Sequence, residues 1–403
     1  MYSLSVAERH GSDGDYAPRW AETTGKDMNL PNCKSLRLLG NTVLIAGLGC
    51  WGAATAQVRT ETVSAGLENP WGVAFLPGGR FLVTERAGRL KPIGSDGRVG
   101  APIAGLPAIA AGGQGGLLDV LADSGFETNR TVYFCFSEPA SGGSANSTAL
   151  ARARLSDDGA RLENLRIIFS QQPKVASRNH FGCRIVESRD GTLFLTLGDR
   201  YSRKEDAQTL DNHLGKIVRI AKDGTVPRDN PFAGRAGALP EIWSYGHRNG
   251  QGATLSPDGR LWMIEHGPQG GDEINVPQAG RNYGWPVVTY GENYGGGKIG
   301  DGLTARDGME QPLHYWVPSI APSGMAFLTS DRYRAGWKGN LFVGSLKFGY
   351  LDRIELRDGK VVAEHKLLAD GRARIRDVKQ GPDGWLYVLT DEADGKLLRL
   401  RPD

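Results

Sequence analysis

Short runs of apolar and β-branched residues recur along the chain, and each run follows a turn that contains glycine or asparagine. In residues 190–196, for example, Asp-Gly-Thr leads into Leu-Phe-Leu, and the run ends on a threonine. The same pattern occurs six times, at residues 77–85, 129–134, 190–196, 258–263, 338–343 and 383–388. Apolar runs of this length between turns are typical of β-strands, whereas helical periodicity is nearly absent. The pattern therefore predicts an all-β protein.

The spacing of the six runs indicates how the strands are organised. Intervals of roughly 45 to 80 residues suit repeating units of four short strands with insertions between them. One such unit cannot bury its apolar face alone and must stack on its neighbours around an axis. The sequence thus predicts a six-bladed β-propeller over residues 57–403. We expect the ring to close through pairing of residues 71–75 with residues 397–400 in one sheet.

The composition agrees with a β-rich chain and excludes one class of partner. The 403 residues include 57 glycines and 21 prolines, which suits many turns. The formal net charge of +3 is close to neutral for this length. A chain of this kind lacks the basic footprint of a protein that binds nucleic acid or an anionic membrane surface. We therefore expect no nucleic-acid partner.

The start of the chain differs from the rest and resembles a secretory signal. Lys34 and Arg37 precede an apolar run over residues 38–51, which is short for a membrane span. The Ala-Thr-Ala sequence of residues 54–56 matches a signal-peptidase site. These features predict cleavage after Ala56.

The expected domains follow from this cleavage site. Residues 28–56 form the predicted signal peptide, and residues 1–27 are a mis-assigned or disordered extension before a true start at Met28. This predicts a periplasmic protein without stable membrane insertion, and the alternative is a retained signal anchor. A lipoprotein is disfavoured, because Gly47 stands where its signal would have leucine.

Two cysteines remain after the predicted cleavage, Cys135 and Cys183, and both lie in apolar strand-like runs. An oxidising compartment permits a disulfide between them. Two buried free thiols fit the sequence equally well. The spacing does not resemble a zinc site.

Polar groups gather at strand ends in the middle of the chain. They are Arg248-Asn249, Gly267-Pro268 and Asp272-Glu273. An arginine can hold an anionic ligand through its planar fork of donors. Carbonyl oxygens of a Gly-Pro turn and two carboxylates are hard oxygen donors that suit calcium. The alternative interpretation of Asp272-Glu273 is a solvated turn.

Two earlier units supply further candidates. Gln114 lies among glycines that allow a ligand to approach the backbone closely. His180 precedes the third repeat, and a histidine can act as a general base because its pKa lies near the operating pH. Asp199 ends that repeat and could brace His180. The alternatives are an ordinary surface turn for Gln114 and a structural role for His180.

The last two units contribute positive charge. Lys347 ends the strand of the fifth repeat, and Arg374 and Arg376 lie on the same face of a later strand because side chains alternate. With no acidic residue between them, the two arginines invite a ligand with several negative charges. The alternative is a solvated sheet edge.

Taken in this order, the candidates resemble those of the soluble quinoprotein sugar dehydrogenases in the glucose/sorbosone dehydrogenase family. The resemblance runs from about Leu67 to Arg401 and is strongest to the aldose sugar dehydrogenase branch. It implies a six-bladed propeller that holds pyrroloquinoline quinone (PQQ) and Ca²⁺ at the channel mouth. It also implies oxidation of aldose sugars at C1 to aldonolactones, with electrons passed to an external acceptor such as a cytochrome or a quinone.

The resemblance also implies a role for each matched residue. His180 would be the general base, with Arg248 and Gln114 orienting the sugar and the quinone. The implied PQQ contacts are Gln114, His180, Arg248, Asn249, Lys347, Arg374 and Arg376. The implied calcium ligands are the carbonyls of Gly267 and Pro268 at the cofactor, and Glu273 and the Tyr283 carbonyl at a structural ion, with Asp272 nearby.

The chain departs from the better-known glucose-oxidising members in three respects. Asn179 precedes the base where those members carry aspartate. An aromatic residue that covers PQQ in some relatives would fall near Trp316 or Val317. The chain is also shorter, so fewer insertions surround the sugar pocket, and we expect broad aldose specificity.

Two other functions remain alternatives at this point. A calcium-dependent propeller hydrolase of the lactonase type would keep the carboxylates and the metal, but it has no use for Lys347, Arg374 and Arg376. A non-catalytic propeller that binds a partner or a glycan would need neither His180 nor these cations.

Overall fold

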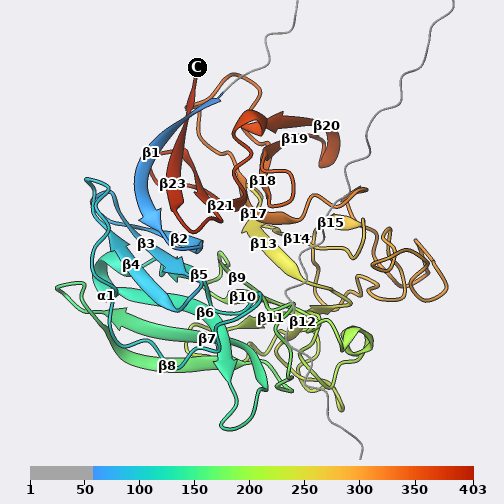
Figure 1. The fold of residues 1–403 in the computed structure, drawn as a ribbon. Coiled ribbons are helices and arrows are strands. Elements are labelled where there is room, and N and C mark those ends of the chain that lie inside the picture. The colour runs from blue at the N-terminus through green and yellow to red at the C-terminus, as the bar shows by residue number, and fades with distance from the viewer. Residues whose placement is uncertain (1–57) are drawn as a thin grey trace, which may run out of the picture. The chain divides into compact units, whose positions relative to one another are not determined.

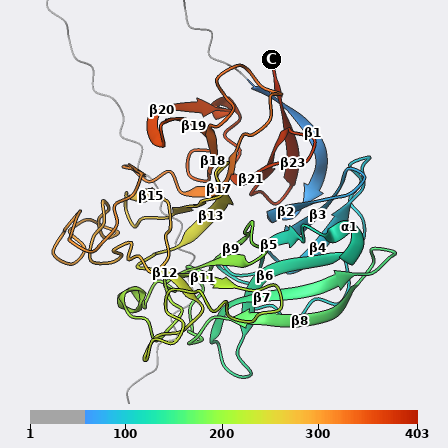
Figure 2. The ribbon, with the colours of Figure 1, turned by 180° about the vertical axis from the view of Figure 1, so that it is seen from behind.

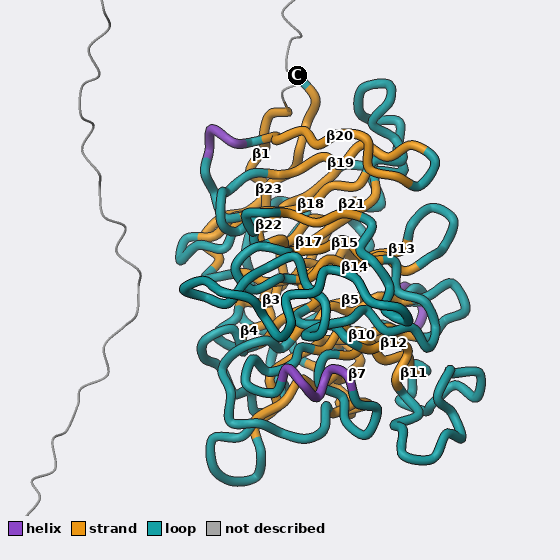
Figure 3. The backbone as a smooth tube through the Cα atoms, turned by 90° about the vertical axis from the view of Figure 1, so that its right-hand side faces the viewer, coloured by secondary structure: helices purple, strands orange, loops and turns teal. Residues whose placement is uncertain are grey.

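The computed structural model describes residues 58–403, so the predicted signal peptide and the extension before it lie outside the described residues. The described chain is a six-bladed β-propeller, as the repeats predict (Figure 1). Helix is confined in this part of the chain to short segments (Figure 3). They are α1 (Phe126–Asn129), η1 (Lys204–Gln208) and η2 (Ala369–Gly371). None of the helices in residues 58–403 is long and apolar enough to cross a bilayer.

The strands form six antiparallel sheets, one for each blade. Blade 1 contains β2 (Pro70–Leu76), β3 (Arg80–Glu85) and β4 (Arg89–Ile93). Blade 2 contains β5 (Leu117–Ala122), β6 (Thr131–Pro139), β7 (Asn146–Leu155) and β8 (Leu162–Ser170). Blade 3 contains β9 (Gly182–Glu187), β10 (Leu193–Leu197), β11 (Lys216–Ile220) and β12 (Ile242–Tyr245).

The second half of the chain forms the other three blades. Blade 4 contains β13 (Gly250–Leu255), β14 (Leu261–Glu265), β15 (Asp272–Asn275) and β16 (His314–Trp316). Blade 5 contains β17 (Pro322–Phe327), β18 (Leu341–Ser345), β19 (Leu351–Arg357) and β20 (Lys360–Leu367). Blade 6 contains β21 (Ile375–Gln380), β22 (Leu386–Thr390), β23 (Gly395–Pro402) and β1 (Val58–Leu67).

The ring closes in blade 6, but not with the predicted partner. β1 pairs antiparallel with β23, with Val58 opposite Pro402. Residues 71–75, which were expected to make this pairing, lie in β2 and begin blade 1. The expectation was wrong because β1 is an edge strand with mostly exposed side chains. A search for apolar runs therefore passes over it.

The first strand of each blade lies beside the channel axis. These inner strands, β2, β5, β9, β13, β17 and β21, contact one another in order around the ring (Figures 1 and 2). Because the strands of a blade are antiparallel, the start of the first strand and the end of the second lie at the same edge. In blade 4, for example, Gly250 is opposite Glu265. One channel mouth therefore collects residues from both positions of every blade.

Buried charges from the inner strands close the channel below that mouth. Arg184 of β9 donates to Asp119 of β5 at 3.1 Å and to Asp377 of β21 at 2.9 Å. Lys379 lies 3.3 Å from Asp119 on the other side. Removing one member of such a network leaves an uncompensated buried charge, at a cost of about 3–5 kcal/mol. The network therefore gives the mouth a rigid floor.

The question about the cysteines is settled by the packing between blades 2 and 3. Cys135 of β6 and Cys183 of β9 are bonded as a disulfide, with their Cα atoms 5.7 Å apart. Both are fully buried in an apolar cluster with Leu118 and Leu195. The bridge thus fixes the start of β9, three residues after His180.

Candidate active site

At the mouth, a buried acidic residue lies at or just after the end of the second strand in several blades. These residues are Glu85, Asp199, Glu265 and Asp391. Three of them contact residues predicted for the site or next to it. Asp199 contacts His180, Glu265 contacts His247, and Asp391 contacts Arg374 and Arg376. Only Asp199 was noticed in the sequence. Comparing the same position of each repeat would have found Glu265 and Asp391.

His180 and Asp199 form a closely hydrogen-bonded pair at the mouth. The Nδ1 atom of His180 lies 2.6 Å from Oδ1 of Asp199, and both side chains are buried. The other carboxylate oxygen accepts a hydrogen bond from the indole of Trp285 at 2.7 Å. Because the carboxylate holds the proton on Nδ1, the Nε2 atom is left to accept one.

The charges of this pair suit a base. Burial lowers the pKa of His180 below its usual value, although the hydrogen bond with Asp199 acts in the opposite direction. Burial alone would raise the pKa of Asp199, but its hydrogen bond with His180 and the nearby Arg248 hold it below its usual range. At neutral pH the pair is therefore an uncharged imidazole beside a carboxylate.

Gln114 contacts the backbone of the same histidine. Its Oε1 atom accepts a hydrogen bond from the main-chain N–H of His180 at 2.8 Å. The turn that presents Gln114 needs glycine, since Gly116 has φ of 156° and an added Cβ would lie 1.9 Å from the carbonyl oxygen of Arg86. The structure thus brings Gln114 and His180 together, as predicted, although they lie in different blades.

Arg248 and Asn249 lie just before β13 and extend the site into blade 4. Nη1 of Arg248 donates to the carbonyls of His266 and Gly267 at 3.0 and 2.7 Å. Asn249 accepts a hydrogen bond from the main-chain N–H of Gly182 at 3.1 Å. Within residues 58–403, Nε of Arg248 and Nδ2 of Asn249 are buried and have no hydrogen-bond partner. Each of these donors is available to an acceptor from outside the chain, such as a water molecule or a ligand.

The three predicted cations lie together on the opposite side of the mouth. Nη2 of Arg374 and of Arg376 both donate to Oδ2 of Asp391, at 3.0 and 2.8 Å. Arg374 also donates to the carbonyl of Leu346, beside the exposed Lys347. Burial alone would raise the pKa of Asp391, but the two arginines lower it to about 2.

The sequence predicted that no acidic residue lies between Arg374 and Arg376, and none does. Asp391, which follows β22, supplies the partner from the next strand. This one carboxylate contacts two arginines, and Lys347 follows the Leu346 carbonyl that Arg374 contacts, so the region carries a positive excess that suits an anion. Gln251 joins this side to the other, since it contacts Arg376 at 3.3 Å and Asn249 at 3.2 Å.

The predicted calcium ligands are divided between two places. Glu273 and Tyr283 line a small cavity with Gly267 and Glu265. Burial and the Glu265 carboxylate raise the pKa of Glu273 to about 8. Two carboxylates that face each other in this way, with carbonyl oxygens beside them, offer the donor set that calcium prefers. In the described part of the chain, no three His, Cys, Asp or Glu side chains converge as a metal cluster.

Asp272 points to a different place from Glu273, because neighbouring residues of a strand face opposite ways. Its carboxylate accepts hydrogen bonds from the main-chain N–H groups of Gly267 at 2.8 Å and Ala321 at 2.9 Å, and from Ser319 at 3.0 Å. These bonds tie the Gly267 turn to the loop before β17. Asp272 therefore acts here as a brace for the turn.

The residues considered for an aromatic cover differ in exposure. Trp316 is buried, and its indole donates to Glu364 at 3.0 Å. The adjoining Val317 is 62% exposed. Trp316 is thus part of the packing between blades 4 and 5 and cannot cover a ligand at the mouth.

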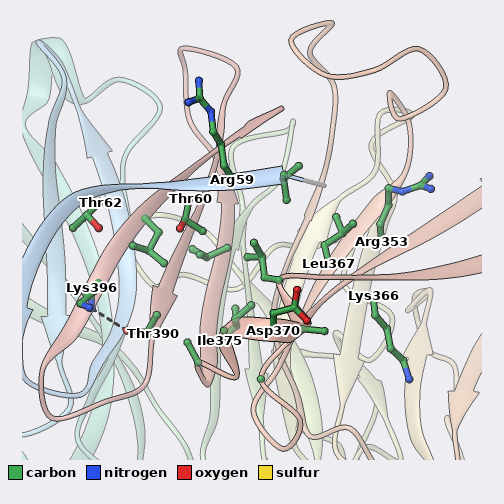
Figure 4. A pocket seen from close by; sticks show the side chains of 18 of the residues that line it. Arg59, Thr60, Thr62, Arg353, Lys366, Leu367, Asp370, Ile375, Thr390 and Lys396 are labelled. Carbon is green, nitrogen blue, oxygen red and sulfur yellow. Dashed lines mark hydrogen bonds between the residues drawn. The ribbon is translucent and has the colours of Figure 1, made fainter. Parts of the chain in front are cut away.

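A larger cavity lies between blades 5 and 6, and none of the predicted site residues lines it (Figure 4). Thr60, Leu367 and Ile375 are among its lining residues. The charged ends of Arg353 and Lys366 lie over aromatic rings and point away from it (Figure 4). The cavity is also lined by His365, Arg59 and Lys396, but by none of the residues that the sequence singled out.

Comparison with known proteins finds a family model and relatives that match most of the chain. A family model described as Glucose / Sorbosone dehydrogenase matches residues 67–399. Aldose sugar dehydrogenase YliI of Escherichia coli (strain K12) is 45% identical over 355 residues, which cover 87% of this chain and 94% of that protein. The solved apo-form of the soluble aldose sugar dehydrogenase from Escherichia coli superposes with a TM-score of 0.83 at 44% identity, covering 86% of this chain and 100% of that one.

A second solved structure bears on the cofactor. The PQQ-bound form of an aldose sugar dehydrogenase from Streptomyces coelicolor superposes with a TM-score of 0.70. It is 28% identical and covers 86% of this chain and 99% of its own. The fold is thus similar to that of a protein whose solved structure holds PQQ.

Proposed function

This chain belongs to the glucose/sorbosone dehydrogenase family, and on that basis we propose that it oxidises aldose sugars at C1 to aldonolactones with PQQ and Ca²⁺. The observation that supports this most is the His180–Asp199 pair, which faces the cations of Lys347, Arg374 and Arg376 across one mouth. A base opposite an excess of positive charge suits a neutral alcohol substrate beside an anionic cofactor.

His180 is the proposed general base. Its Nε2 atom takes the proton of the anomeric hydroxyl, because Nδ1 is already committed to Asp199. Trp285 and Asp199 keep the imidazole in this orientation. The chemistry that PQQ would supply here is that of a hydride acceptor for C1 as the sugar becomes a lactone.

The proposed cofactor contacts lie on both sides of the mouth. Lys347, Arg374 and Arg376 would hold carboxylates of PQQ. Nε of Arg248 and Nδ2 of Asn249 are the buried donors available on the opposite side. Gln114 and Arg248 orient the reacting groups between the two sides.

We propose that calcium binds at the Gly267 turn and in the adjoining cavity. The carbonyl oxygen of Gly267 accepts one hydrogen bond from Arg248 and keeps a second lone pair, and the carbonyl of Pro268 follows it in the turn. Glu273 and the carbonyl of Tyr283 would hold the structural ion. Its positive charge would stabilise the ionised form of Glu273, whose pKa is raised in its absence.

We also propose a broad aldose range, an external cytochrome or quinone as electron acceptor, and a periplasmic location. The test of the main proposal is dye-linked oxidation of pentoses, hexoses and disaccharides by purified protein, with and without PQQ and Ca²⁺. We expect turnover only when both are present. Absence of PQQ binding would favour the lactonase-type hydrolase, and strict preference for one sugar would disprove the broad range.

A further inference from the structure

Tyr201 is a large aromatic side chain at the mouth to which no role has been given above. It follows Asp199 by two residues and is 51% exposed. Its ring centroid lies 5.3 Å from that of His180, with the two planes at 81°. The ring therefore lies beside the proposed base, and about half of the side chain is open to solvent.

The backbone that presents this ring is strained. Arg200 and Tyr201 both have positive φ, 60° and 67°. Residues other than glycine rarely adopt this backbone conformation, and each one that does lowers the stability by about 1–3 kcal/mol. The main-chain N–H of Tyr201 donates to Oδ1 of Asp199 at 2.8 Å, which ties the turn to the carboxylate that holds His180.

Arg200 anchors the turn from beneath and is completely buried. Its guanidinium donates to Asn146 at 2.7 Å and to the carbonyl of Ser177. It also lies 3.6 Å from the ring centroid of Phe181. The turn thus buries a charge and exposes an aromatic ring, which is the reverse of what burial alone would favour. Strained arrangements of this kind are found where a side chain serves a ligand.

We propose that Tyr201 binds the substrate by stacking on a C–H face of the aldose ring that is oxidised. This rests on the proposed function of the same site. The anomeric hydroxyl must lie about 3 Å from Nε2 of His180 for proton transfer. The Tyr201 ring is close enough to the imidazole to contact that same sugar ring. A sugar face of C–H groups is weakly positive and apolar, which complements the negative face of an aromatic ring.

This geometry distinguishes the reacting sugar from a second sugar unit. Because the contact is made beside the base, it serves monosaccharides and disaccharides alike. A tyrosine that served only the second unit of a disaccharide would lie farther from His180. We thus expect Tyr201 to contribute to the affinity for aldoses in general, including pentoses.

The test compares the wild type with Tyr201→Ala and Tyr201→Phe, each loaded with PQQ and Ca²⁺. We expect Tyr201→Ala to raise KM roughly three- to tenfold for D-xylose, D-glucose and maltose, with kcat changed less than about twofold. Tyr201→Phe keeps the ring and should behave as the wild type. Tyr315→Ala is the matched control, because Tyr315 is 44% exposed but stacks on Tyr290, at 3.8 Å, and not on His180.

Three outcomes would overturn the proposal. An unchanged KM in Tyr201→Ala would exclude stacking. A loss confined to kcat, with a shifted pH profile, would make Tyr201 a positioning residue for His180. An effect limited to maltose would move the contact to a second sugar unit.

Saturation-transfer NMR of D-xylose with each protein reads binding without turnover. Signal in the wild type that Tyr201→Ala loses would support the inference, even if the wild type oxidised no aldose and the proposed function failed.

Discussion

The two sides of the propeller mouth are built in opposite ways. On the side of blades 3 and 4, the base side, His180, Asp199 and Trp285 are buried and joined by hydrogen bonds of 2.6 and 2.7 Å. On the side of blades 5 and 6, the cation side, Lys347 is exposed and the Arg374 side chain is 52% exposed. On the base side, the hydrogen bonds that orient His180 are made within the protein, whereas the cation side carries charges that the protein does not match.

The difference reflects two kinds of chemical task. A proton acceptor must have its tautomer and orientation fixed before the substrate arrives, so its partners are built into the fold. A binding surface for a multiply charged anion needs unmatched cations, because a fully paired cation would have to give up its partner. Asp391 keeps the two arginines in place while its single charge leaves their excess intact.

The largest expected effect comes from breaking the base side. His180→Ala should lower kcat by about 100-fold or more, since general base catalysis contributes roughly 10²–10⁴. PQQ affinity should change only a few-fold, because the cation side is untouched. Dye-linked turnover measures kcat, and a PQQ titration measures the affinity for PQQ. His365→Ala, which changes a histidine of β20 outside the mouth, is the control. Near-normal turnover of His180→Ala would show that another group is the base.

The next largest effect comes from breaking the cation side. Lys347→Ala should weaken PQQ binding by about tenfold or more, because a hydrogen bond to a charged group contributes about 1.5–3 kcal/mol. At saturating PQQ, kcat should stay within a few-fold of the wild type. Fluorescence titration at low and high salt measures this, with the exposed Lys360→Ala of β20 as control. A loss of kcat at saturating PQQ would mean that the two sides are not separable.

The sequence revealed the two sides unequally. His180 and Asp199 flank one repeat, so a local pattern could link them. Trp285 could not be found in this way, because it reaches Asp199 from 86 residues away through a long insertion. Asp391 was missed because the strand that contains the arginines does not contain their partner.

The fold shows the same limit. The apolar runs predicted six blades, since each run is the second strand of a blade and is buried along almost its whole length. The closing strand β1 was misplaced because its side chains are mostly exposed and form no such run. The disulfide between Cys135 and Cys183 remained undecided for a related reason: the contact between two blades depends on how the sheets stack. Burial of a strand produces an apolar run that can be recognised in the sequence. Which distant strand or residue it contacts cannot be recognised in the same way.

The expected effect on calcium binding is smaller than the two effects above, and it depends on pH. In the metal-free protein, the pKa of Glu273 is raised from 4.5 to about 8, so stability falls as pH rises through this range. Calcium needs the carboxylate, so its affinity should rise between about pH 6 and 8, by at most tenfold per unit. Glu273→Gln should lose this dependence and bind calcium about tenfold more weakly. Thermal unfolding with calcium and with chelator measures both. A pH-independent affinity in the wild type would exclude Glu273 as the ligand.

The smallest effect concerns Asn179, which stands where the better-known glucose-oxidising relatives are expected to have aspartate. The residue precedes His180, is half-buried, and its main-chain N–H donates to Ser177 at 3.2 Å. Asn179→Asp places a second carboxylate beside the imidazole without changing its hydrogen bond to Asp199. A negative charge favours the protonated imidazole, so the pKa of His180 should rise from its lowered value.

The consequence is a shift of the acid limb of kcat/KM to higher pH, by less than about one unit, with the plateau above that limb unchanged. Asn179→Ser is the uncharged control and should leave the limb in place. If the acid limb of kcat/KM stays at the same pH in both variants, it does not reflect the ionisation of His180. A lowered plateau in Asn179→Asp alone would mean that the added charge disturbs the geometry of the base side. The expected result, a shift at constant plateau, would show that electrostatics can tune this side while its hydrogen bonds keep it rigid.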